Sequence, residues 1–96
     1  MDLHLNVKSR YFNQYIAGQK PYEYRLYNDY WKKRLVGKSY NTIHYKAGYP
    51  SKDQASKIRI MPYCGYKIQT IQHPHFGDKP VKVFAIKLDS LKAKGL

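Results

Sequence analysis

The first residues of the chain show the spacing of a strand followed by that of a helix. Leu3, Leu5 and Val7 are hydrophobic and the residues between them are polar, which predicts a strand with one buried face. The next hydrophobic residues recur at helical spacing and predict a helix from Ser9 to Ala17, capped by its first residue and ended by Gly18. A strand and a helix therefore open the fold.

Pro21 directs the chain out of this helix into an extended segment that runs to about Leu26. Because side chains alternate along a strand, Glu23 and Arg25 are expected to point to the same side. Strict alternation would place Lys20 on the opposite side. Lys20 joins the other two only if the backbone turns at Pro21, which is a geometric prediction.

A second helix and a third strand are expected next. Asn28 or Asp29 is placed to cap a short helix that ends at Gly37. Hydrophobic and polar residues alternate again over 39–46, and a polar loop follows over 48–57. The order so far is strand, helix, strand, helix, strand.

The second half of the chain is β in character. The runs 58–62 and 66–72 are predicted strands separated by a glycine that indicates a turn or bulge. After a loop over 73–80, residues 81–88 are apolar on both faces, as is typical of a central strand. Residues from about 90 to 96 are expected to form a short tail with one helical turn.

This order of elements predicts the fold class. The chain of 96 residues is expected to form one α+β domain over 1–96. A mixed, mostly antiparallel, barrel-like sheet of five to six strands, flanked by two short helices, is the compact arrangement expected for it.

The charge of the chain favours a polyanionic partner. The net charge is +12, and each half carries nine Lys or Arg against three Asp or Glu. A positive field of this kind attracts nucleic acid, the commonest polyanion in a cell. No apolar run is long enough to span a bilayer, and no signal-peptide core is recognised. A single cysteine, Cys64, suits a reducing compartment, so a cytoplasmic location is expected.

Basic and aromatic residues are mixed along the chain, which contains eleven tyrosines. This mixture is typical of proteins that bind single-stranded nucleic acid. The alternative is a solvated basic face over tyrosines that belong to the core. The predicted nucleic-acid-binding residues are Lys8, Arg10, Lys20, Arg25, Lys32, Lys33, Arg34, Lys38, Tyr40, Lys46 and Tyr49.

Glu23 is the only glutamate of the chain, and it lies between Lys20 and Arg25. An isolated carboxylate in a basic protein implies a specific partner, and structural ion pairs are a frequent outcome. If the protein is an enzyme, these three residues are the candidate catalytic groups, with Lys20 as base or nucleophile. Pairing with Glu23 would instead keep Lys20 cationic and suited to binding a phosphate.

This segment resembles the signature of the ASCH domain, a branch of the PUA-like superfamily, in a short single-domain form. The matching positions are Gly18-x-Lys20-x-x-Glu23-x-Arg25, with Tyr11-Phe12 before them and Asn28-Asp29 and Val36-Gly37-Lys38 after them. The match covers roughly residues 3–50. The later strands are compatible with the family but unspecific.

The resemblance implies a small PUA-like β-barrel whose motif lines a cleft that binds RNA or modified nucleotides. Some ASCH proteins resemble amidohydrolases that deacetylate N(4)-acetylcytidine with the motif lysine, and others are assigned ribonuclease activity. The amidohydrolase branch has a hydroxyl residue in place of Glu23 and a second glutamate later in the chain. Here only Asp53, Asp78 and Asp89 could replace that second carboxylate.

His73 and His75, together with Cys64, are candidate ligands of a zinc site. It would need a fourth ligand from His4, His44 or an aspartate, and the paired spacing of structural zinc sites is missing. No metal and no cofactor are therefore predicted. Cys64 is expected to be a small hydrophobic residue rather than an activated nucleophile.

Three hypotheses follow from these observations. The first is an RNA-binding or modified-nucleotide-binding domain, with RNA favoured over DNA and no membrane partner. The second is a hydrolase that uses the same cleft, either a ribonuclease or an N(4)-acetylcytidine amidohydrolase. The third is a module that binds an acidic protein.

Overall fold

A computed structural model describes residues 1–89 and 94–95. Its elements, in chain order, are β1 (Asp2–Val7), α1 (Ser9–Ile16), β2 (Tyr22–Leu26), α2 (Asp29–Leu35), β3 (Thr42–Ala47), η1 (Ala55–Lys57), β4 (Ile58–Pro62), β5 (Tyr66–Ile71), η2 (Pro74–Phe76), β6 (Val81–Lys87) and β7 (Lys94–Gly95).

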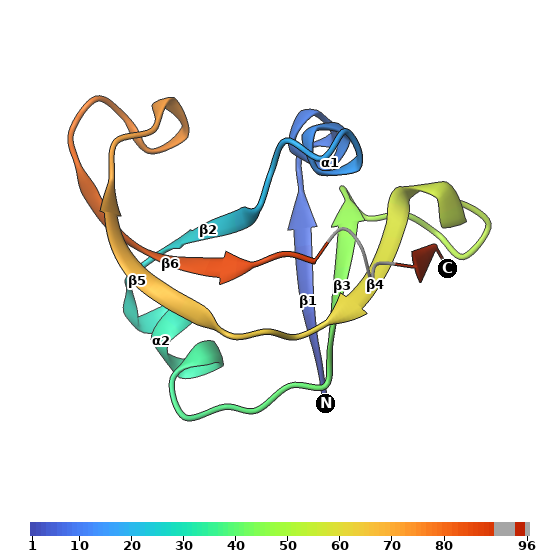
Figure 1. Cartoon of the computed structure of the whole chain (residues 1–96), viewed down its shortest axis with the longest axis horizontal. Helices are drawn as coiled ribbons and strands as arrows, with labels where there is room; N and C mark the ends of the chain where they lie inside the picture. The colour runs from blue at the N-terminus through green and yellow to red at the C-terminus, as the bar shows by residue number, and fades with distance from the viewer. Residues whose placement is uncertain (90–93, 96) are drawn as a thin grey trace.

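The described strands form two sheets that cross one another in Figure 1. The first has the order β1-β3-β4-β7, in which β1 and β3 are parallel and the other pairs antiparallel. The second has the order β2-β6-β5 and is antiparallel throughout. The predicted α+β class with two short helices is confirmed.

The expectation of one barrel-like sheet of five to six strands is corrected. The seven described strands are divided between two sheets and do not close a barrel. The division occurs between β4 and β5, where Gly65 has a φ of +83°. This left-handed conformation suits glycine, and it turns the chain out of the first sheet so that β5 pairs with β6.

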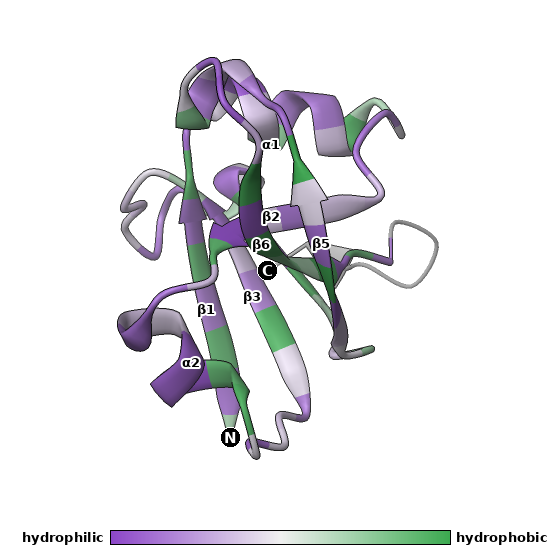
Figure 2. Ribbon diagram, turned by 90° about the vertical axis from the view of Figure 1, so that its left-hand side faces the viewer, coloured by the Kyte–Doolittle hydropathy of each residue, from purple (hydrophilic) through white to green (hydrophobic). Residues whose placement is uncertain are grey.

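The core lies between the two sheets and includes residues of both helices. The predicted central strand is confirmed as β6, where Val83, Phe84, Ala85 and Ile86 are fully buried between β2 and β5. From the first sheet, β1 and β3 contribute every second residue. Figure 2 shows this alternation of hydrophobic and hydrophilic positions along both strands.

The end of α1 sets the path of the chain toward the predicted motif. Gly18 has a φ of +75°, and its N–H donates to the carbonyl of Tyr15, which is a helix ending that favours glycine. The start of the helix differs from the prediction. Lys8 occupies the N-cap position without a side-chain cap, and Ser9 is already helical.

The second helix begins and ends as predicted. The Asn28 side chain accepts a hydrogen bond from the Trp31 N–H at 3.0 Å, and Leu35 is buried in the core. The third strand starts at Thr42, three residues later than predicted. None of the described helices is long and apolar enough to cross a membrane.

The predicted tail falls partly outside the described residues. Residues 90–93 and 96 are not described, so the helical turn expected there is not tested. Lys94–Gly95 form β7, which pairs with β4 across Arg59 and Ile60. The part of the tail that is described is therefore a strand.

Candidate functional site

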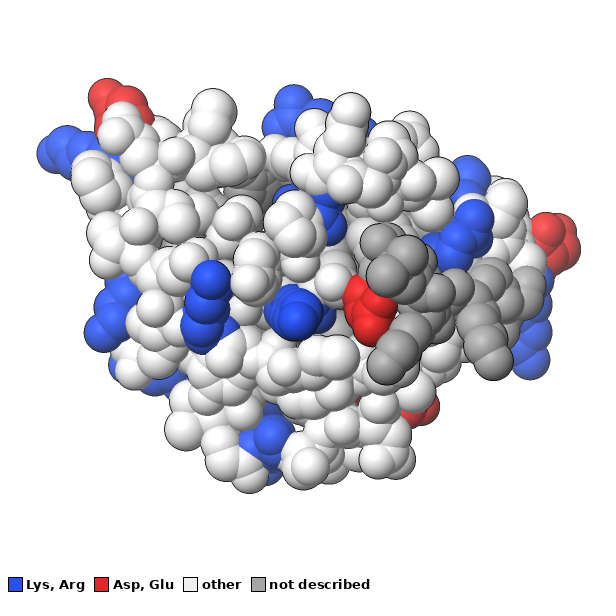
Figure 3. Space-filling view, in the orientation of Figure 1, with Lys and Arg blue, Asp and Glu red and all other residues white. Residues whose placement is uncertain are grey.

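A cleft of about 300 Å³ opens between β2, α1 and the loop that joins β5 to β6. Figure 3, in the same orientation as Figure 1, shows the surface hollowed between α1 and this loop. The residues that line the cleft are Asn6, Val7, Lys8, Tyr11, Lys20, Glu23, Tyr24, Arg25, His73, His75 and Phe76. All three candidate catalytic residues are among them.

Glu23 lies at the base of the cleft and is only 4% exposed. Its Oε2 accepts a hydrogen bond from Arg25 Nη1 at 2.8 Å, and its Oε1 accepts one from the Tyr45 hydroxyl at 2.7 Å. A buried carboxylate is costly unless it is paired and hydrogen-bonded. Both carboxylate oxygens accept a hydrogen bond, so Glu23 is held in place and in turn positions Arg25 and Tyr45.

Arg25 is mainly occupied by acceptors of the protein itself. Besides Glu23, its guanidinium donates to the carbonyls of Tyr24 at 2.9 Å and Asn6 at 3.1 Å. It also lies over the ring of Trp31, 5.4 Å from the ring centroid. The sequence left open whether Arg25 clamps Glu23 or grips a ligand, and these contacts favour the clamp.

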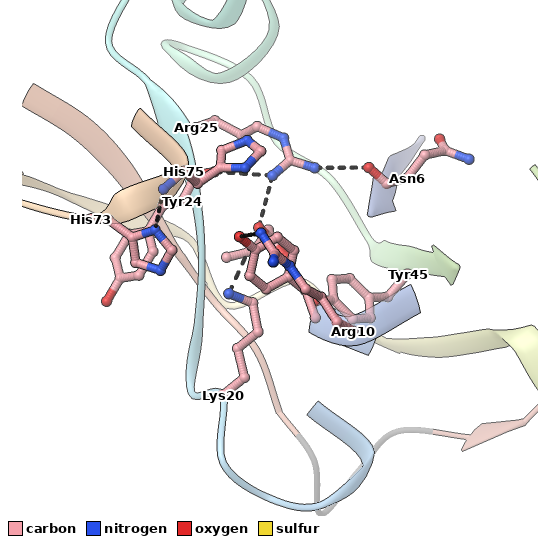
Figure 4. Close-up of polar contacts among 10 residues, drawn as sticks. Asn6, Arg10, Lys20, Tyr24, Arg25, Tyr45, His73 and His75 are labelled. Carbon is pink, nitrogen blue, oxygen red and sulfur yellow. Dashed lines mark hydrogen bonds and ion pairs between the residues drawn. The ribbon is translucent and has the colours of Figure 1, made fainter. Parts of the chain in front are cut away.

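Lys20 lies beside the other two residues, so the condition that the sequence set for this, a turn of the backbone at Pro21, is met. Its Nζ lies 4.0 Å from Glu23 Oε2, too far for a hydrogen bond. The ammonium group lies 4.9 Å from the ring centroid of Tyr11 and 5.6 Å from that of Tyr24. Figure 4 shows Lys20 and Arg25 pointing toward one another from the stretch of chain that leads into β2, with Tyr45 of β3 beside them.

Aromatic and imidazole rings form the opposite wall of the cleft. His75 meets the Tyr11 ring edge-on at 5.7 Å and the Phe76 ring at 5.0 Å between centroids. His73 Nδ1 accepts a hydrogen bond from the His75 backbone N–H at 3.1 Å, which fixes the short η2 turn. The cleft therefore presents flat rings and cations to any bound molecule.

Burial and the cations around the cleft lower the pKa of His75. Partial burial lowers the pKa of His75 below its ordinary value of 6.5, and the positive charges of Lys8, Arg10 and Arg25 lower it further. Near neutral pH the imidazole is therefore uncharged. It becomes a further cation of the cleft only at lower pH.

The predicted nucleic-acid-binding residues fall into separate groups. Lys8, Lys20 and Arg25 line the cleft, and Arg10 lies beside it with its guanidinium over the Tyr11 ring. Lys32, Lys33 and Arg34 belong to the last turn of α2, outside the cleft, and Lys38 follows them as an exposed residue.

Three further residues of the predicted set differ in how far they are accessible. Tyr40 is half-buried against Tyr63, and its hydroxyl donates to the Arg34 carbonyl. Lys46 is half-buried and pairs with Asn6 in the parallel ladder. Tyr49 is 91% exposed. Tyr49 is thus the most accessible of the three to a ligand.

The other sequence candidates lie away from the cleft. Cys64, expected to be a small hydrophobic residue, is a free and exposed cysteine outside the core. Asp53, Asp78 and Asp89 do not line the cleft as far as the described residues define it. No group of three or more histidine, cysteine or acidic side chains suited to a metal occurs in the described part of the chain.

Sequence reasoning missed the wall made by 73–76 and the role of Tyr45. From the sequence, His73 and His75 are candidates only as metal ligands, because nothing in their local sequence indicates that they face the segment 20–25, some fifty residues earlier. Tyr45 did carry a signal, since it alternates with Ile43 on the buried side of β3. A buried tyrosine hydroxyl needs a partner, and Glu23 is the only glutamate of the chain.

No family model, curated protein or solved structure matches this chain. The fold and the site define a small α+β domain whose two sheets carry a basic cleft lined with aromatic rings.

Replacing Tyr45 with phenylalanine tests the hydrogen bond beneath the cleft. The substitution removes the donor to Glu23 and keeps the ring, so we expect the free energy of unfolding to fall by about 1.5–3 kcal/mol. Burial and the neighbouring Glu23 carboxylate raise the pKa of Tyr45, which keeps the hydroxyl protonated as a donor. Urea denaturation measures the change.

Tyr15→Phe is the matched control for this experiment. Tyr15 is also buried, but its hydroxyl donates to a backbone carbonyl, that of Asp89, at 3.2 Å. A smaller loss, of about 1 kcal/mol, is expected for this neutral bond. Equal losses in both variants would contradict a special role for the bond from Tyr45 to Glu23.

The pKa of His75, measured by NMR titration, reports on the positive charge around the cleft. We expect a pKa below 6.5 in the free protein and an upward shift when inorganic phosphate is added, because a bound anion favours the protonated ring. By linkage, anion affinity then increases as the pH falls through this pKa. Lys8→Ala should raise the pKa, and a free-protein value above 6.5 would contradict the arrangement.

Proposed function

We propose that this chain is an ASCH-like domain of the PUA-like class that binds RNA or a modified nucleotide in the cleft. The observation that carries the proposal is the position of Lys20. Its ammonium lies between the rings of Tyr11 and Tyr24 and has no hydrogen-bond partner among the described residues. It is therefore available to an incoming anion next to surfaces on which a base stacks.

The size of the cleft supports a nucleotide rather than a duplex. Its volume of about 300 Å³ falls at the lower end of ligand pockets, about 300–1,000 Å³. The half-buried rings of Tyr24 and Phe76 offer surface to a base, and Lys8 and Lys20 offer charge to a phosphate. One nucleotide of a single strand uses both kinds of group.

The remaining charge of the protein supports a longer nucleic acid around this nucleotide. The net charge of +12 provides a field that attracts phosphates beyond the cleft. The preference for RNA over DNA, the cytoplasmic location and a PUA-like relation between the two sheets rest on the resemblance and on the composition of the chain.

A hydrolase in the same cleft is the second candidate, and the two imidazoles favour it. His73 and His75 line the cleft together with Lys20, and an uncharged imidazole is a suitable general base near neutral pH. Ribonuclease activity fits this set better than amidohydrolase activity with Lys20 as the activated group. The second carboxylate of the amidohydrolase branch has no counterpart in the lining described above.

One experiment separates binding from catalysis. The purified chain is incubated with labelled single-stranded RNA and with N(4)-acetylcytidine, and bound fraction and product are recorded together. We expect Lys20→Ala to weaken RNA binding by about 10- to 100-fold, because a charge-assisted hydrogen bond contributes about 1.5–3 kcal/mol. The slope of log affinity against log salt should fall by about one.

Lys57→Ala is the matched control, since Lys57 is exposed and outside the cleft. It removes the same charge from the surface and should change affinity far less. Equal effects of the two variants would contradict binding in the cleft. Product formation that is lost in Lys20→Ala would establish the hydrolase, and failure of RNA to compete with an acidic protein would favour the protein-binding module.

A further inference from the structure

The free edge of β1 borders two hollows. β1 is one of the two edge strands of its sheet among the described strands, and it pairs there with β3. Asn6 and Val7, near its end, line the cleft described above. Asp2, Leu3 and His4, near its start, line a second hollow of about 260 Å³ together with Tyr30, Trp31 and Arg34 of α2. Figures 1 and 2 show α2 beside the lower part of β1, at the end away from α1.

The second hollow repeats the chemistry of the first. Tyr30 is 55% exposed, and the Arg34 guanidinium lies over its ring, 3.4 Å from the centroid. The Trp31 ring meets Tyr30 edge-on at 5.2 Å. The acidic group present, Asp2, is held by the Thr42 hydroxyl at 2.6 Å and lies 3.5 Å from His44. The exposed ring of Tyr30 and the neighbouring Arg34 guanidinium are therefore the groups that a ligand would contact.

One contact connects the two hollows. Arg25 lines the first, Trp31 lines the second, and the guanidinium lies over the indole. Arg25 also donates to the carbonyl of Asn6, which faces away from β3 along the free edge of β1. A cation and an aromatic ring therefore lie where the two hollows meet, and the Glu23 carboxylate beside them is already bonded to Arg25.

We propose that the second hollow is a further nucleotide subsite, so that a single strand of nucleic acid lies along the free edge of β1 through both hollows. This inference rests on the proposed function and extends it from one nucleotide to a strand. Leu3 and Asn6 are three residues apart, which corresponds to about 10 Å along a strand. Neighbouring bases of an unpaired strand can separate to reach both hollows, whereas stacked bases of a duplex cannot.

Oligonucleotide length and one substitution test the subsite. Binding of a uridine mononucleotide and of an octauridylate is measured by fluorescence anisotropy or calorimetry for the full chain and for Tyr30→Ala. We expect the octamer to bind more tightly than the mononucleotide. Tyr30→Ala should weaken the octamer by about 5- to 150-fold, since stacking on an aromatic side chain contributes about 1–3 kcal/mol per base.

The mononucleotide provides the internal reference. It occupies the first cleft, so its affinity should be the same in Tyr30→Ala and in the unaltered chain. Tyr30→Phe keeps the ring and should restore octamer binding. Tyr22→Ala removes a tyrosine that also faces a cation, Lys67 at 4.6 Å, but lies in neither hollow, and it should leave both affinities unchanged.

The outcomes separate this inference from the function on which it rests. The second subsite would be overturned if the octamer bound no more tightly than the mononucleotide, or if Tyr30→Ala left the affinity for the octamer unchanged. Either result would leave the first cleft as proposed. No binding of either molecule would overturn both. Measuring an octadeoxyuridylate in parallel distinguishes RNA from DNA as the bound strand. A duplex that binds as tightly as the single strand would contradict the inference.

Discussion

The structure depends on the burial of one carboxylate, that of Glu23, between the two sheets. Glu23 belongs to β2 of the second sheet, and its partner Tyr45 belongs to β3 of the first. Arg25 binds Glu23 and also the Asn6 carbonyl of β1. Leaving such a group without partners would cost about 3–5 kcal/mol. These bonds therefore join the two sheets directly beneath the cleft.

Lys20, Glu23 and Arg25, which the sequence presents as one set, have different roles in this arrangement. Glu23 and Arg25 satisfy each other and neighbouring backbone groups, so they support the cleft and leave little capacity for a ligand. Lys20 has only the longer ion pair and the tyrosine rings around it. A cation held near, but not bonded to, a buried carboxylate keeps its hydrogen bonds for an incoming anion.

The sequence predicted what local patterns determine and failed where distant segments meet. Both helices and the central strand follow from spacing, proline and glycine, whereas the sequence predicts the meeting of Lys20 with Glu23 only on the condition of a turn at Pro21. The separation into two sheets does not, because strand pairing joins β2 to β6 across some sixty residues. His75 and Phe76 as a wall of the cleft depend on the same long-range pairing.

Chemical-shift mapping by NMR tests the central claim most directly: the cleft supported by Glu23 is where a nucleotide binds. A labelled chain is titrated with cytidine monophosphate, and backbone amide shifts are followed residue by residue. The largest changes are expected at Tyr11, Lys20, Tyr24 and residues 73–76, which line one cleft from three segments. Changes spread evenly over exposed lysines, or no change at saturating nucleotide, would contradict the claim.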